Sequence, residues 1–296
     1  MNCLKSNTKI IITIKNNAIL SIVLTLLFNI SSISSFAQYS EDHPKHENHY
    51  SVETIETSDV LIEFENAHSQ QTFTTVKLKV TNKTSDYILY KSNESTFIYA
   101  HGDFKVNGAV VLKHKNILIE PNSIESIALK LTGGNSFHVK DLKLDLKGFY
   151  KVKAKGNVIA VPDFKLPVET NNFVTSPFEC FLKKSVKEAE ETIAFFECTY
   201  NGSQVGMINS TLLSFANDNS TINYVNEIRK DKVEIIHNGE IFKFKAVARI
   251  PKKIFDMQLN TMIIKWNSSF IESSEVFLKM PVVEFVFNPD ITLLKN

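Results

Sequence analysis

The sequence predicts an all-β protein of two tandem sandwich domains that follow a signal peptide. Three observations support this prediction. The amino terminus has the layout of a secretory signal, the rest of the chain alternates polar residues with β-branched and aromatic ones, and the alternating pattern occurs twice. Helical periodicity is scarce, while Asn, Gly, Asp and Pro separate short segments of strand character.

Residues 1–37 predict a cleaved signal peptide. Three lysines and no acidic residue accompany the apolar run 18–28, and the small residues Ser35 and Ala37 close the segment. A retained membrane anchor is the alternative, but an eleven-residue run is shorter than the roughly 20 residues needed to span a bilayer. We therefore expect cleavage after Ala37 and no transmembrane segment afterwards.

The composition indicates where the protein is located and which kind of partner is disfavoured. Without the three signal lysines, 30 basic residues face 32 acidic residues, and the whole chain has only two arginines. This balance argues against a nucleic-acid partner. The Lys-, Asn- and Ile-rich, arginine-poor composition is typical of an AT-rich bacterium. We expect an exported protein of a Gram-negative bacterium, located in the periplasm or outside the cell.

Four segments recur in the same order at nearly the same shift of about 117 residues. The matching pairs are 60–82 with 178–200, 117–131 with 233–247, 142–149 with 259–266, and Leu166-Pro167 with Met280-Pro281. Each unit holds some seven short strands, which is typical of an immunoglobulin-like sandwich. The sequence thus predicts immunoglobulin-like domains at 53–170 and 174–292, after a disordered, histidine-rich lead-in at 38–52.

Residues 178–200 carry the tripeptide Phe-Glu-Cys twice. The two tripeptides contain the only two cysteines of the predicted mature chain. A hairpin centred on Ala189 would pair residues whose numbers sum to 378, so that Cys180 faces Cys198. A helical turn near Ala189 would instead spoil this pairing.

The sister repeat indicates what the cysteines do. Their counterparts at a shift of 118 are Ile62 and Val80, which predicts an inward, apolar position. In an exported protein we expect a disulfide between Cys180 and Cys198. Two buried thiols are the alternative, and a metal or redox site is disfavoured because the cysteines have no CxxC spacing and no adjacent histidine.

The lead-in supplies a candidate metal site. His43, His46 and His49 are spaced three apart among acidic residues, and imidazole and carboxylate groups are suitable ligands for a divalent metal. The alternative is a polar, disordered lead-in without a ligand. The sequence carries no HExxH, no GxSxG, no phosphate-binding glycine loop and no calcium loop. It therefore predicts no catalytic residue and no cofactor.

Residues 117–134, preceded by 78–90, resemble the amino-terminal domain of periplasmic pilus chaperones. The resemblance implies two immunoglobulin-like domains behind a signal peptide and a role in assembling surface subunits. Our first hypothesis is a non-enzymatic exported binding or scaffold protein that presents sheet edges or loops to an unknown protein or glycan. A chaperone that pairs an edge strand with client subunits is the second, and a metal-binding protein that uses the histidine tract is the third.

Overall fold

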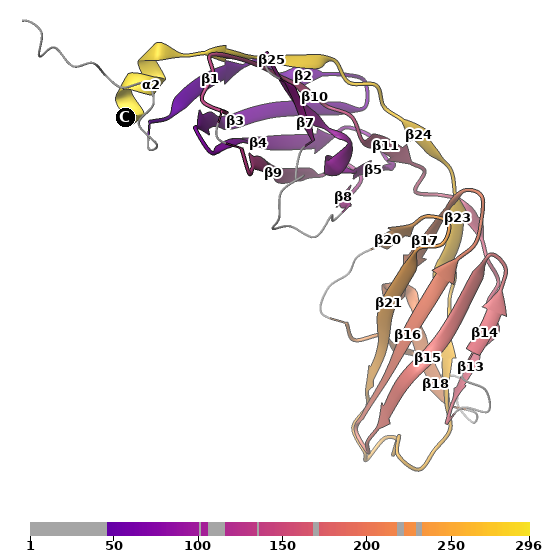
Figure 1. Cartoon of the computed structure of the whole chain (residues 1–296). Coiled ribbons are helices and arrows are strands. Elements are labelled where there is room, and N and C mark those ends of the chain that lie inside the picture. Colours follow the sequence, from indigo (N-terminus) through magenta and orange to yellow (C-terminus); the bar gives the residue numbers. More distant parts are fainter. Residues whose placement is uncertain are drawn as a thin grey trace, which may run out of the picture. The chain divides into compact units, whose positions relative to one another are not determined.

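The computed structural model describes residues 46–100, 102–105, 116–134, 136–167, 172–217, 222–228 and 233–296. Antiparallel strands make up most of this part of the chain, which confirms the all-β class (Figure 1). None of the helices within it has the length and apolar character needed to cross a membrane. The predicted signal peptide lies outside the described residues.

The first half of the chain contains β1 to β11 and one short 3-10 helix, with the following bounds: β1 (Asn48–Val52), β2 (Ile55–Glu56), β3 (Val60–Gln70), β4 (Phe73–Asn82), β5 (Tyr87–Tyr90), η1 (Ser92–Glu94), β6 (Thr96–Tyr99), β7 (Gly102–Lys105), β8 (Ile117–Ile119), β9 (Ile124–Thr132), β10 (Asp141–Asp145) and β11 (Phe149–Val152).

The second half contains β12 to β25, a second 3-10 helix and one α-helix, with the following bounds: β12 (Asn157–Val158), β13 (Phe164–Leu166), β14 (Asn172–Thr175), β15 (Phe178–Lys187), β16 (Glu191–Tyr200), β17 (Val205–Asn209), η2 (Ser210–Leu212), β18 (Ser214–Asn217), β19 (Tyr224–Val225), β20 (Val233–Ile236), β21 (Ile241–Arg249), β22 (Met262–Lys265), β23 (Phe270–Ser273), β24 (Glu275–Phe277), β25 (Val282–Phe287) and α2 (Pro289–Lys295).

Two large cores form because inward residues alternate with outward ones along these strands. The first core lies between the sheet β24-β11-β5-β8 and the path β7-β6-β10-β25-β1-β3-β4-β9, in which β1 contacts both β25 and β3. The second core is enclosed by the sheets β14-β15-β16-β21, β13-β22-β18-β19 and β12-β23-β17-β20. The strands of the described residues thus enclose two separate large groups of buried side chains.

The hairpin register predicted for the second repeat is confirmed up to a β-bulge. Cys180 pairs with Cys198 and Leu182 with Phe196, after which the register shifts by one residue. The first repeat pairs Ile62 with Val80 at the equivalent place. Cys180 and Cys198 form a disulfide, and both cysteines are fully buried in the second core. They therefore replace an aliphatic pair of the sister hairpin.

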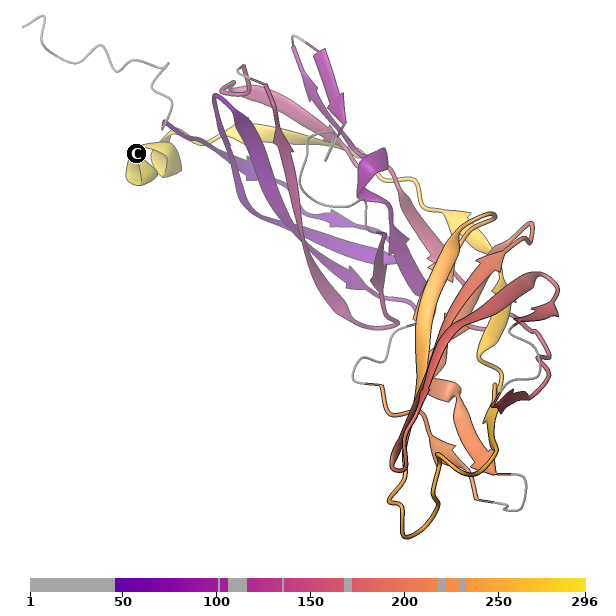
Figure 2. The ribbon, with the colours of Figure 1, turned by 60° about the horizontal axis from the view of Figure 1, so that its bottom comes forward.

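The last strands of the two repeats are exchanged. By their place in the chain, β12 and β13 should complete the first core, but they pair with β23 and β22 of the second repeat. Strands β24 and β25 follow the second repeat and pair with β11 and β10 of the first. Figure 2 shows the yellow end of the chain returning to the strands drawn in indigo and magenta.

This exchange differs from the expected domain boundaries of 53–170 and 174–292. The first core contains Met280, Val283 and Phe285 from the end of the chain, whereas Phe164 and Leu166 belong to the second core. Two strands of similar pattern occupy similar slots, so local pattern alone does not decide which strand fills which slot. The physical units are consequently discontinuous in sequence.

Candidate metal centre

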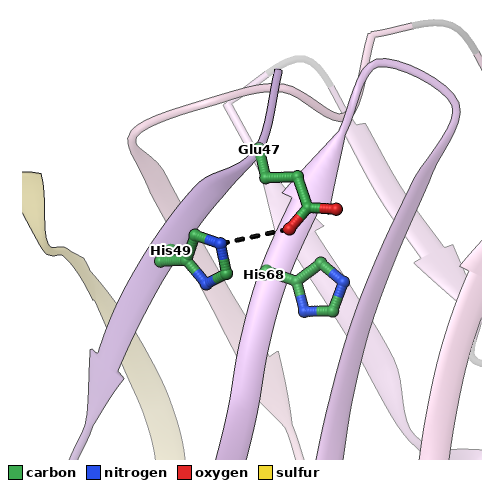
Figure 3. Close-up of side chains that lie close together, drawn as sticks. All are labelled: Glu47, His49 and His68. Atoms are coloured by element: carbon green, nitrogen blue, oxygen red, sulfur yellow. Dashed lines mark ion pairs between the residues drawn. The ribbon is translucent and has the colours of Figure 1, made fainter. Parts of the chain in front are cut away.

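Glu47, His49 and His68 lie close together at the start of β1, where this strand pairs with β3 (Figure 3). In the antiparallel pairing of β1 with β3, His49 lies directly opposite His68. Glu47 is two residues before His49, and the strand period of two therefore places both side chains on one face. The three side chains form the group that we call the Glu-His-His cluster.

A β-bulge positions His68. The pairing of β3 with β4 shifts register between Glu65 and His68, and Asn66 within this bulge has a positive φ of 50°. An extra residue in a strand turns the following side chains relative to the sheet. The bulge also brings the Asn66 carbonyl oxygen 2.9 Å from Nδ1 of His68.

The ligand atoms of the cluster could bind one metal ion after small side-chain rotations. Each residue offers one ligand atom, and these atoms all lie within 4.8 Å of one another. Ligands about 2.1 Å from a tetrahedral zinc ion are about 3.4 Å apart. Side-chain rotations that shorten the longer separations by about 1.4 Å would thus complete the site.

Burial leaves His49 with an unsatisfied ring nitrogen. The residue is only 9% exposed. Its buried Nε2 lies 3.1 Å from Oε2 of Glu47, but the arrangement does not meet hydrogen-bond geometry. An unsatisfied buried polar atom is costly in a folded protein and requires an explanation. A bound cation would satisfy this nitrogen.

Burial also lowers the pKa of His49, and the neighbouring His68 lowers it further, while Glu47 opposes both effects. The imidazole is therefore neutral near pH 7, which is the form that binds metals. The rings of His49 and His68 stack with centroids 5.4 Å apart.

Hydrogen bonds outside the cluster orient the other two ligands. The Asn66 carbonyl can only accept, so Nδ1 of His68 donates to it, and Nε2 is the ring nitrogen left for a metal. Gln70 donates from Nε2 to Oε1 of Glu47 at 2.7 Å, while the other carboxylate oxygen faces His49. Such outer contacts to a carbonyl or a carboxylate are typical of metal ligands.

The structure joins one residue of the predicted histidine tract to two others. His49 belongs to the cluster, His46 does not, and His43 lies outside the described residues. Glu47 is one of the acidic residues of the same tract, so the sequence already offers it as a ligand. His68 is not in the tract, and its place in the cluster requires the register between β1 and β3.

Within the described residues, the Glu-His-His cluster is the one group of three or more histidine, cysteine or carboxylate side chains with ligand atoms at metal-site spacing. Cys180 and Cys198 are joined as a disulfide and take no part in it. No protein-family model matches the chain, and no curated protein matches it significantly.

Proposed function

We propose that this chain is an exported, non-enzymatic binding protein that holds a divalent transition metal at Glu47, His49 and His68. The observation that carries the proposal is the buried Nε2 of His49, which faces a carboxylate and a second imidazole but has no hydrogen bond. The buried imidazole of His49, the imidazole of His68 and an oriented carboxylate are a suitable ligand set for such a metal.

The donor atoms indicate the class of metal. Two imidazole nitrogens and one carboxylate oxygen suit zinc, copper, nickel or iron(II), whereas calcium and magnesium favour sites built from oxygen alone. Three protein ligands leave at least one coordination position for water or for a group of a partner. Zinc is a suitable probe because it has no redox chemistry and accepts this ligand set.

The proposal includes export after cleavage at Ala37 to the periplasm or the cell exterior, and the buried disulfide is compatible with such a compartment. It also includes immunoglobulin-like domains that present a surface to an unknown protein or glycan. A chaperone role is the alternative. It would use a sheet edge such as β9, which within the described residues pairs with β4 alone.

Calorimetric titration of residues 38–296 with zinc tests the metal site. We expect one zinc ion per chain, and a loss of affinity of roughly tenfold or more for His49→Asn and for His68→Asn. His237→Asn is the matched control, because that histidine also contacts carboxylates but lies outside the cluster.

His46→Asn separates the two possible ligand sets. If the tract of His43, His46 and His49 binds the metal, His46→Asn weakens binding and His68→Asn does not. The Glu-His-His cluster requires the opposite result. A wild-type chain that gives no zinc-binding heat, or a His68→Asn variant with wild-type affinity, would overturn the proposed site.

A further inference from the structure

Strand β1, which contains His49 and directly follows Glu47, has an unusual neighbour. Strand β25 pairs with β1 from Tyr50 to Val52, and the pairing stops there. Beside Glu47 and His49, the helix α2 takes the place that a continued strand would occupy. The backbone of the two ligand residues is therefore held by α2 and its two cap residues.

The contacts to His49 involve both of its backbone groups. Its N–H donates to Oγ1 of Thr292 at 3.0 Å in a buried position, and Thr292 is only 4% exposed. Its carbonyl oxygen accepts from the backbone N–H of Asn288 at 2.8 Å. Asn288 also caps α2, because its side chain accepts from the N–H of Ile291 at 3.0 Å. The start of the helix and the position of His49 are thereby tied together.

Glu47 is held in the same manner at the other end of α2. Its backbone N–H donates to Oδ1 of Asn296, and Nδ2 of Asn296 donates to its carbonyl oxygen, both at 2.7 Å. A single side-chain amide thus replaces both hydrogen bonds of a strand partner. Four hydrogen bonds from α2 and its cap residues fix the backbone of two ligands, while His68 lies on β3, which also pairs with β4.

We propose that Thr292 and Asn296 are positioning residues of the metal site, so that metal binding and the docking of α2 stabilise each other. This inference rests on the proposed metal-binding function. Without α2, the start of β1 loses its partner on that side, and binding a metal then requires ordering Glu47 and His49. Linkage makes the effect reciprocal: whatever α2 adds to metal affinity, the metal adds to the docking of α2.

The helix has the properties of a segment whose docking can respond to a ligand. It is seven residues long and exposes Leu293 and Leu294 by 74% and 85%, so it buries few apolar side chains. Short helices are marginal in water, and segments with few buried apolar contacts open locally at low cost. Since α2 ends the exchanged segment that begins at β24, a bound metal would also help to hold that segment on the first core.

Zinc titrations of α2 variants test the coupling. We expect Thr292→Val and Asn296→Ala each to weaken zinc binding about three- to tenfold, which corresponds to the loss of one or two hydrogen bonds. Thr292→Ser keeps the hydroxyl group and should retain wild-type affinity. Leu294→Ala is the matched control, because this exposed side chain of the same helix makes no contact on which the coupling depends.

Hydrogen exchange supplies a readout that a purely structural role would not move. In the wild-type chain, zinc should slow amide exchange in residues 288–296, and in His68→Asn, which alters no contact of α2, zinc should have no such effect. Zinc binding without protection of α2, or wild-type affinity in Thr292→Val, would overturn the coupling alone. A wild-type chain that binds no zinc would overturn the proposed function and the coupling together.

Discussion

The hairpins β3–β4 and β15–β16 share a register and a β-bulge but carry different chemistry. At the same inward position, the first has Ile62 opposite Val80 and the second has Cys180 bonded to Cys198. The fold accepts either solution because both pairs are apolar, buried and directly opposed. A repeated framework can thus keep its packing while one copy gains a covalent link.

Around the bulge, it is the first repeat that carries the reactive side chains. At the shift of 118 that relates the hairpins, the cluster residues have counterparts that cannot form an equivalent ligand set: Lys165, Pro167 and Val186. The first repeat therefore differs most at the bulge of β3, whereas the second differs most in its core. Bulges change the direction of side chains and leave the rest of the sheet paired, so the bulge of β3 is the position at which we propose binding.

A pair of matched substitutions tests whether the last strands of the two repeats are exchanged. Phe285 in β25 and Leu166 in β13 are both buried and hold similar places in the two repeats. We expect Phe285→Ala to cost about 3–5 kcal/mol in the first core and Leu166→Ala about 2–5 kcal/mol in the second. Hydrogen exchange of residues 60–82 and 178–200 reports which core is loosened.

The single tryptophan gives an independent signal for this test. Trp266 is buried in the second core, so its fluorescence should follow unfolding earlier in Leu166→Ala than in Phe285→Ala. A continuous tandem arrangement requires the reverse, with Phe285→Ala loosening residues 178–200. That reversal would contradict the exchange of strands.

Removing the disulfide of the second hairpin should have the next largest effect on stability. Replacing both Cys180 and Cys198 by valine restores an aliphatic pair of the kind found in the first hairpin. By the chain-entropy estimate, opening a loop of this length costs about 3 kcal/mol of the free energy of unfolding. Urea unfolding followed by Trp266 fluorescence measures the loss, and wild-type protein under reducing conditions is the control. Equal stability of the variant and the oxidised wild type would show that the link does not stabilise the second core.

The sequence supports some of these features better than others, for physical reasons. The period of two and the repeat shift are enough to place Cys180 opposite Cys198, because the pairing is local to one hairpin. They do not determine the exchange, since β13 and β25 have similar patterns and only long-range packing selects their slots. His68 was missed for a related reason: its contact with His49 depends on the bulge at Asn66 and on a pairing between separate strands.

The smallest predicted effect concerns an ion pair in the first repeat, between Lys151 of β11 and Asp59 at 2.7 Å. The hydrogen bond from Lys151 lowers the pKa of Asp59, and burial opposes this only in part. Because the pKa of Asp59 is lower in the folded state than in the unfolded state, the pair stabilises the protein above the unfolded-state pKa. Its contribution is lost as the pH falls through the folded-state pKa.

Lys151→Met should therefore lower the free energy of unfolding by roughly 0.5–1 kcal/mol near neutral pH, as is typical of a partly exposed pair. The difference from the wild type should vanish in acid, once Asp59 is protonated in both states. Urea unfolding across this pH range tests the expectation, with Lys155→Met as a control at an exposed lysine nearby. At the shift of 118, Pro177 replaces Asp59 in the second repeat, so the effect should be confined to the first core. A difference between the variant and the wild type that is constant with pH would show that Lys151 acts through packing of its aliphatic chain and not through the charge of Asp59.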